Sequence, residues 1–332
     1  MNTVSIVLNN YNYARFLRQA IDSALGQTYP HCEVIVVDDG STDGSVEIIR
    51  SYGSKIRAVI KENGGQASAL NAGFAQARGE IIKFLDSDDY LCPTAAERIV
   101  SAWNDGVKIL HHRVRIVDAD GKELGFMPPK RCELDSGDVV PLLLLRGGYS
   151  VPPTSGQVYS RNVLQKLLPM PEEDFRICAD TWLLYKAPFV APITVLDEDL
   201  ASYRHHDANA WAPSESRRLM GRRKIEIFIK FIDVAHALIV EQAAERGLAT
   251  ADRFTWEASV NWRFRLILKR LGSPVVAGQK GSVLISNMIK AMRLESLAWS
   301  ERVRNILLAL MIWLAPRFVL RRMYPNIFNQ PS

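Results

Sequence analysis

The chain has 332 residues, 48% hydrophobic and 23% charged, which is enough for a globular core and more than one average domain. Its four cysteines lie far apart with no Cys-x-x-Cys pair, which excludes a small disulfide-stapled secreted domain and predicts a reducing, cytoplasmic compartment. The net charge of +5 is uneven, because residues 1–214 hold 21 Lys and Arg against 27 Asp and Glu, whereas residues 215–332 hold 20 against 9. The two parts are therefore expected to face different partners.

The N-terminus lacks the layout of a signal peptide, since its first apolar run is only Val4–Leu8 and no basic residue precedes Arg15. We expect that run to be a strand. Over the first hundred residues, short β-branched runs alternate with amphipathic segments, which predicts right-handed crossovers and a mostly parallel sheet. The expected strands are 4–8, 33–37, 58–60 and 81–85, and the expected helices are 16–25, 46–52, 67–77 and 95–103.

Polar groups follow three of these strands at the points where the strands end. Asn9-Asn10 follows the first, Asp38-Asp39 the second and Asp86-Ser87-Asp88 the fourth. Ligands of open α/β sheets bind beyond the carboxyl ends of the strands, so the three groups should share one rim. Gathered carboxylates repel one another unless a cation compensates them, and Mg²⁺ or Mn²⁺ prefers such oxygen ligands. The pattern predicts a divalent metal site.

The alternation of strands and helices ends near Lys108. Segments 107–117 and 123–126 flank the turn signal Asp118–Gly121, which predicts an antiparallel hairpin. A stretch rich in Pro and Gly pairs follows up to Pro152-Pro153, and such loops often carry substrate contacts. Residues 180–187 have a helical pattern, and 203–209 are expected to form a polar loop.

After Pro213 the pattern becomes helical, at roughly 215–247, 251–271 and 299–323. The segment Ile306–Pro316 is an apolar run of eleven residues, too short for the roughly 20 that span a bilayer. Arginines at both ends and Trp313 within it favour an in-plane anchor on an anionic membrane surface. Packing against neighbouring helices and formation of a homo-oligomer are the alternatives.

Several motifs in order then identify a resemblance. They are Val4–Leu8 leading to Tyr11-Asn12, Gln27–Tyr29, Val36–Asp43, Asn63–Gln66 with Asn71–Gly73, and Gly79-Glu80 before Asp86–Asp89. Over about residues 3–210 the chain resembles family 2 glycosyltransferases of the GT-A fold. The resemblance implies an α/β, Rossmann-like GT-A fold with a mostly parallel central sheet and helices on both faces. It does not cover the C-terminal third, where the sequence pattern predicts a helical extension.

Together with the helical and basic character of the residues after Pro213, the resemblance predicts a division of the chain. Residues 1–213 would form the GT-A domain, with a nucleotide-sugar-binding half at 1–105 and an acceptor-binding half at 106–213. Residues 214–332 would form a basic, helical C-terminal region.

By the same resemblance, Asp39 contacts the nucleotide base or ribose and Asn9 lies beside the base. Asp88 is the ligand of Mn²⁺ or Mg²⁺, and Asp86 contacts the ribose or supports the metal. A family-like Tyr-Arg-x-His loop puts His206 near the metal or pyrophosphate. The remaining nucleotide-sugar contacts are expected at Tyr11, Gly65, Asn71, Ser87 and Arg204.

In the family the catalytic base usually lies in a Glu-Asp pair that opens a later helix, and here the pair reads Ala179-Asp180. Asp180 is therefore the expected base of a metal-dependent, inverting transfer from a nucleoside-diphosphate sugar to a glycan or lipid-linked glycan hydroxyl. The implied setting is cell-surface polysaccharide synthesis, in the cytoplasm or on the inner face of the membrane. The alternative is a non-catalytic, sugar-nucleotide-binding or scaffolding member of an envelope assembly complex.

Simpler interpretations exist for each signal. The 38–43 segment could be an ordinary capped turn, Asp180 a helix cap and His206 a solvated loop residue. A nucleotidyltransferase would need a basic, Gly-rich loop after the first strand, and a dinucleotide enzyme would need Gly-x-Gly-x-x-Gly there. The segment Asn9–Tyr13 that follows this strand has neither pattern, which argues against both classes of enzyme. A receiver domain would leave Asp86–Asp88 unexplained. No motif supports nucleic-acid binding by the basic third, so no nucleic-acid partner is expected.

Overall fold

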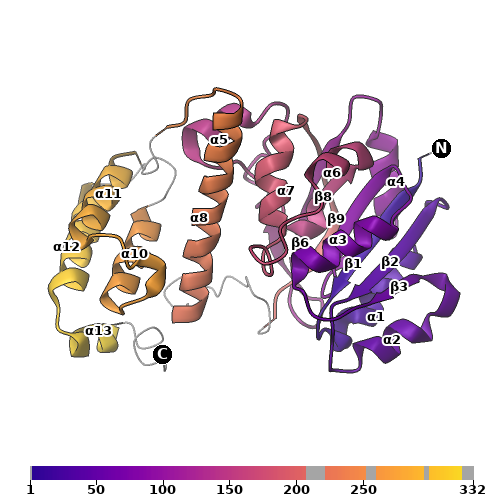
Figure 1. Ribbon diagram of the computed structural model, residues 1–332, viewed down its shortest axis with the longest axis horizontal. Helices are drawn as coiled ribbons and strands as arrows, with labels where there is room; N and C mark the ends of the chain where they lie inside the picture. The colour runs from indigo at the N-terminus through magenta and orange to yellow at the C-terminus, as the bar shows by residue number, and fades with distance from the viewer. Residues whose placement is uncertain (1, 207–220, 252–258, 295–298, 324–332) are drawn as a thin grey trace. The chain divides into compact units, whose positions relative to one another are not determined.

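The computed structural model describes residues 2–206, 221–251, 259–294 and 299–323 (Figure 1). These residues fall into two compact units, one of residues up to 140 together with 149–206, and one of 141–148 together with the residues after 220.

The first unit is built on one mixed sheet, whose strand order is β3-β2-β1-β4-β8-β6-β9-β5, with β7 paired to β6. Strands β1 to β4 are mutually parallel, whereas β8 runs antiparallel to both β4 and β6. The strands are β1 (Val4–Asn10), β2 (Cys32–Asp38), β3 (Arg57–Ile60), β4 (Ile81–Asp86), β5 (Tyr90–Leu91), β6 (Ile109–Val117), β7 (Glu123–Met127), β8 (Gln157–Ser160) and β9 (Ile193–Arg204).

Helices cover both faces of the parallel half of the sheet. On one face, buried residues of α1 pack with Ile6 and Leu8 of β1 and with Ile49 of α2. On the other face, α3 approaches so closely that a Cβ at Gly73 would lie 2.3 Å from Val7 Cγ1. The helical elements of this unit are α1 (Ala14–Leu25), α2 (Ser45–Ser51), η1 (Gly53–Lys55), α3 (Gln66–Gln76), α4 (Ala95–Ala102), η2 (Thr154–Gly156), α6 (Arg161–Leu167), α7 (Asp180–Lys186) and η3 (Ala187–Phe189). The expected α/β class with helices on both faces is confirmed.

The strand register aligns the predicted polar groups. Asn9 is the partner of Asp86 between β1 and β4, and Asn10 is the partner of Asp38 between β1 and β2. Because these strands are parallel, their carboxyl ends meet at one edge of the sheet. The expected hairpin is also present as β6 and β7, which pair antiparallel.

Strand β9 corrects the expectation of a polar loop at 203–209. It continues through Tyr203 and Arg204, while residues 207–209 lie outside the described part. The acidic segment Asp197–Asp199 interrupts the apolar pattern that would indicate a strand in the sequence. Here the acidic side chains pair with arginines of α4 and β6, including Arg115 Nη2 with Asp199 Oδ2 at 2.5 Å, so charge does not prevent strand pairing.

The second unit is helical, as its sequence pattern predicts, but its boundaries differ. The 299–323 segment is two helices separated at Ala315-Pro316, because proline cannot donate a helical hydrogen bond. Part of the 251–271 prediction, residues 252–258, lies outside the described residues. The elements are α5 (Val140–Arg146), α8 (Arg222–Glu245), α10 (Ser259–Arg270), η5 (Pro274–Val276), α11 (Gly281–Leu294), α12 (Trp299–Leu314) and α13 (Arg317–Met323). Within the described ranges, no helix has both the length and the apolar character needed to cross a bilayer.

Candidate functional site

The turn after β4 holds three carboxylates in a small buried space. Asp88 and Asp89 are 7% and 1% exposed, and Asp89 N donates to Asp86 O at 3.0 Å. Burial, followed by the charges of Asp88 and Asp180, raises the pKa of Asp86 to about 7. Burial and the neighbouring carboxylates also raise the pKa of Asp89 well above its usual range. The cluster is therefore a place where added positive charge would stabilise the ionised form.

Asp88 and His206 converge on one point. His206 Nε2 lies 3.0 Å from Asp88 Oδ2, although 118 residues separate them in the chain. The imidazole is fixed by aromatic neighbours, with its centroid 4.7 Å from that of Phe16 and 5.6 Å from that of Tyr13. The structure thus brings together the two residues predicted as metal ligands.

This pair suits a divalent cation of the Mn²⁺ or Mg²⁺ type. A carboxylate oxygen and an imidazole nitrogen are ligands that Mn²⁺ accepts, whereas Mg²⁺ favours oxygen. No cluster of three or more His, Cys, Asp or Glu ligands occurs among the described residues. Two protein ligands would leave the other coordination positions to substrate phosphates and water, as is usual for nucleotide-linked metals.

Asp86 lies at the centre of a hydrogen-bond network. Its carboxylate accepts hydrogen bonds from the side chains of Asn9 and Thr154, and from Gln66 Nε2 at 3.3 Å. Asn9 Oδ1 and Ser87 Oγ are buried and have no hydrogen-bond partner among the residues that the structure describes. Such atoms normally meet a ligand or water, so both predicted contacts leave a polar atom available at this rim.

Asp180 lies in the first turn of α7 and close to this network. Burial raises the pKa of its carboxyl to about 6, while Thr154 donates a hydrogen bond to it. The preceding residue is tied to α3, because Ala179 N donates to Gln66 Oε1 at 2.9 Å. The helix N-cap residue is Ala179, so Asp180 does not serve as the N-cap. Thr154 and Gln66 therefore each connect Asp86 with the segment that carries Asp180.

Asp39 accepts hydrogen bonds from a loop that leads into α3. Its carboxylate accepts from Lys61 Nζ at 2.8 Å, Gly64 N at 2.9 Å and Gly65 N at 2.7 Å. Gly65 has φ of 92°, and a Cβ there would lie 2.5 Å from Arg176 Cα. Glycine is required at this position both by the left-handed backbone and by the close approach of the 176 segment.

Arg204 is buried, and its donors are used within the protein. Nε donates to Asp88 O at 2.9 Å and the backbone N donates to Asp89 Oδ1 at 2.8 Å, so the residue holds the turn that carries Asp88 against β9. Its terminal nitrogens donate to Ala119 O and Gln19 Oε1. Its contact with a nucleotide sugar stays a prediction.

Two further predicted contacts lie apart from the network. Tyr11 is 48% exposed just beyond β1. Asn71, within α3, exchanges hydrogen bonds with Met170, donating to its O at 3.0 Å and accepting from its N at 2.9 Å. The side chain of Asn71 thus anchors the 170 segment.

Thr154 and Ser155 are the residues at this site that sequence reasoning missed. They follow Pro152-Pro153 in the stretch expected to carry substrate contacts, which is the one signal the sequence offers. Buried Lys83 of β4 fixes the short η2 turn that holds them, because its Nζ donates to Ser155 O. The same Nζ contacts His112 Nε2 at 2.9 Å. Two small hydroxyl residues in a loop give no periodic signal.

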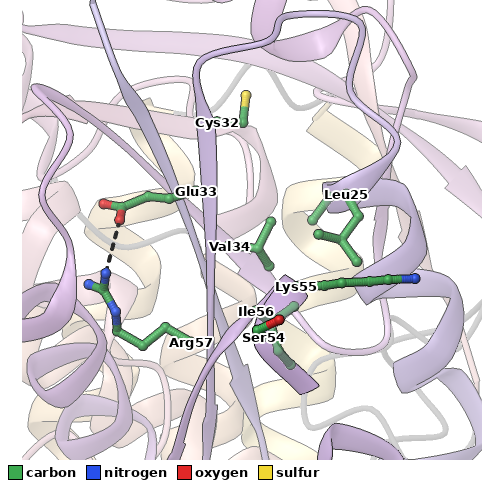
Figure 2. Close-up of a pocket in the computed structure, with 9 residues that line it drawn as sticks. Leu25, Cys32, Glu33, Val34, Ser54, Lys55, Ile56 and Arg57 are labelled. Carbon is green, nitrogen blue, oxygen red and sulfur yellow. Dashed lines mark ion pairs between the residues drawn. The ribbon is translucent and has the colours of Figure 1, made fainter. Parts of the chain in front are cut away.

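A cavity of about 370 Å³ lies elsewhere in the unit. Figure 2 shows its lining residues, among them Leu25 from the end of α1, Cys32 and Val34 from the start of β2, and Ser54 from η1, with Glu33 and Arg57 paired at 3.6 Å. The start of β2 is the opposite end of the sheet from Asp38 and the carboxylate network. This cavity is therefore separate from the candidate site.

Comparisons with known proteins agree with the geometry. Residues 5–168 match the family model Glycosyl transferase family 2. An uncharacterized glycosyltransferase of Nostoc sp. is 33% identical over 305 residues, which cover 86% of this chain and 94% of the relative.

Two solved structures share the fold. TarS of Staphylococcus aureus in complex with UDP-GlcNAc gives a TM-score of 0.57 at 18% identity and covers 94% of this chain and 90% of its own. The mannosyltransferase PcManGT of Pyrobaculum calidifontis in complex with GDP-Man and Mn²⁺ gives a TM-score of 0.50 at 16% identity, covering 95% and 87%. The solved structures support the GT-A fold. The family model and the relative of Nostoc sp., which is matched over most of its length, show that the chain belongs to glycosyltransferase family 2 and is a glycosyltransferase.

Proposed function

We propose that this glycosyltransferase is metal-dependent and inverting, and that it moves a sugar from a nucleoside diphosphate to a hydroxyl of a glycan or lipid-linked glycan. The observation that carries the proposal is the bridge made by Thr154. Its hydroxyl interacts with the carboxyl groups of both Asp86 and Asp180 and can donate its one hydrogen to either, which ties the proposed base to the turn that carries Asp88. A base is useful in this reaction only if it is held beside the donor-binding groups.

The donor assignment rests on the rim and on the structural neighbours. Asn9 and Ser87 offer buried polar atoms that have no partner in the described part of the chain, and Asp39 organises the loop before α3. TarS was solved with UDP-GlcNAc and PcManGT with GDP-Man. These observations support a nucleoside-diphosphate sugar as the donor of this chain.

The residues then divide the reaction between them. Asp88 and His206 would hold Mn²⁺ or Mg²⁺, which when bound neutralises the charge that develops on the departing diphosphate. The carboxylate of Asp180 accepts the proton of the acceptor hydroxyl. That oxygen forms its bond to the anomeric carbon as the carbon–oxygen bond to the diphosphate breaks. One displacement from the opposite face inverts the configuration.

A lipid-linked glycan as acceptor would bring the reaction to a membrane surface. This agrees with the proposed setting, cell-surface polysaccharide synthesis on the inner face of the membrane.

The test is a panel of UDP-, GDP- and dTDP-sugars incubated with the purified chain, with Mn²⁺ or with EDTA. We expect one donor class to release its nucleoside diphosphate in a metal-dependent way. NMR of the product should show the opposite anomeric configuration to the donor. Equal release in EDTA would exclude the metal dependence, and a retained configuration would exclude the single displacement.

A further inference from the structure

Helix α12 has two apolar faces, and the protein buries only one of them. Ala309 and Ile312 are fully buried in the core of the second unit. Leu307 and Leu314 are 61% and 73% exposed, and Leu310 is 39% exposed. Packing within the unit therefore explains half of the apolar run that the sequence shows.

The exposed apolar residues of α12 lie on one face of the helix. Leu307, Leu310, Met311 and Leu314 follow the i, i+3, i+4, i+7 spacing of a single helix face. The next helix along the chain, α13 (Figure 1, yellow), carries Phe318, which is 73% exposed. We call these residues of α12 and Phe318 the α12 face. An exposed apolar patch of this kind marks a site of interaction.

The tryptophan that suggested an interfacial anchor is on the other side of the helix. A Cβ at Gly281 would lie 2.2 Å from the Trp313 ring, so Trp313 packs against the start of α11. The exposed indole is Trp299, at the first position of α12 and 79% exposed. Along the chain, an exposed aromatic residue therefore precedes Leu307–Leu314 and another follows it, Trp299 and Phe318.

Charge identifies the occupant. Arg304 is exposed one turn before Leu307, and Arg322 is exposed one turn after Phe318. Between residues 300 and 323 the sequence holds five arginines and a single acidic residue. A second copy of the chain in a two-fold dimer would bring these arginines against each other. An anionic bilayer instead offers phosphates to the arginines and hydrocarbon to the leucines.

We propose that the α12 face docks in the plane of an anionic phospholipid surface, with its leucines and Phe318 in the acyl boundary and the flanking arginines at the headgroups. The helix lies on the bilayer and does not cross it, because its opposite face is committed to the protein core. The proposal goes beyond sugar transfer and does not depend on the donor or the base.

The test is flotation of the full chain with phosphatidylcholine vesicles and with vesicles that also contain phosphatidylglycerol. We expect flotation with the anionic vesicles only, reduced by salt. The double variant Leu307→Gln/Leu314→Gln should lower the floated fraction about tenfold, since two well-exposed leucines lose their burial in lipid. The matched control is Val240→Gln/Val283→Gln, two valines of the same unit that are each 49% exposed on other helices.

Three results would overturn the proposal. One is no flotation with anionic vesicles, and another is equal flotation of both double variants. The third is a lipid-free dimer that the Leu307→Gln/Leu314→Gln change dissociates, since this would make the α12 face a contact between copies. Because all readouts are binding or mass, they are distinguishable from failure of the transfer assay.

Discussion

The environment of a single carboxyl group, that of Asp180, decides how the proposed chemistry depends on pH. Burial raises its pKa to about 6, and Thr154 holds it by a hydrogen bond that favours the ionised form. A carboxyl whose pKa lies just below neutrality is a competent base at pH 7 and a stronger proton acceptor than an exposed aspartate. The pKa values of Asp86 and Asp89 are also raised, but these carboxyls accept hydrogen bonds from neighbouring residues, Asp86 from Asn9 and Gln66 and Asp89 from the backbone N of Arg204.

We expect Asp180→Asn to lower kcat by about 100- to 10,000-fold while KM for the donor changes little, because the amide cannot accept the proton. In the wild type, log kcat should rise with pH up to about 6 and then level off, since the base must be ionised. Steady-state kinetics between pH 5 and 8 check both points.

The control for that variant is Asp174→Asn, an exposed carboxylate six positions earlier in the same segment. It should leave kcat and its pH profile unchanged. A wild-type rate in Asp180→Asn with donor binding intact would show that another group is the base.

Two elements far apart in sequence meet at the start of α3, and this contact sets where α7 begins. Gln66 N donates to Arg176 O at 2.9 Å, and Gln66 Oε1 receives Ala179 N. The contact requires Gly65, whose missing side chain leaves room for the Arg176 backbone. The position of Asp180 is thus fixed by the α3 terminus as much as by α7 itself.

We expect Gly65→Ala to lower kcat by about tenfold or more, because a displaced 176–179 segment would shift the Asp180 carboxylate. A control for positive φ is Gly44→Ala, at φ 89° and ψ 4°, whose nearest Cβ contact is 4.0 Å away; Gly65, at φ 92° and ψ 176°, lies in a region that essentially only glycine populates. Gly44→Ala should cost about 1–2 kcal/mol of stability through left-handed strain and leave kcat close to wild type. Equal loss of kcat in both variants would attribute the effect to strain alone.

At the scale of the whole molecule, the carboxylate cluster links stability to pH and to cation binding. The pKa values of Asp86 and Asp180 are raised from 3.8 in the ordinary range to about 7 and about 6. The folded state therefore binds protons more tightly than the unfolded chain. Their contribution to stability is complete below about pH 4 and is lost as pH rises toward about 7. A cation at the cluster would offset that loss.

We expect Mn²⁺ with a nucleoside diphosphate to raise the melting temperature by about 5–10 °C at pH 8, as a ligand near 100 times its Kd does. The rise should be smaller at pH 5.5, which is below the pKa values of Asp86 and Asp180, because their protonated carboxyls no longer attract the cation. His206→Ala should abolish most of the rise at pH 8, because it removes one of the two converging ligands. Differential scanning fluorimetry measures the melting temperatures. An unchanged rise in the His206→Ala variant would show that His206 is not a ligand of the metal.

The sequence by itself determined the parallel half of the sheet and the polar residues at its edge. Apolar runs of strand length alternate there with amphipathic helices, and the polar groups stand directly at the strand ends, so local pattern is enough. The same reasoning failed for β9, where Asp197–Asp199 break the apolar pattern and the compensating arginines come from other elements.

Only the tertiary structure decided how the network is connected and which face of α12 is exposed. Thr154 and Gln66 bond to residues 20 or more positions away in the chain, through hydrogen bonds that no periodicity encodes. The apolar run of α12 has apolar residues on every side of the helix, so the sequence does not indicate which side is buried. The division into a buried face and an exposed face depends on the helices against which α12 packs. Local pattern follows from the chain itself, whereas contacts between distant residues exist only once the chain has folded.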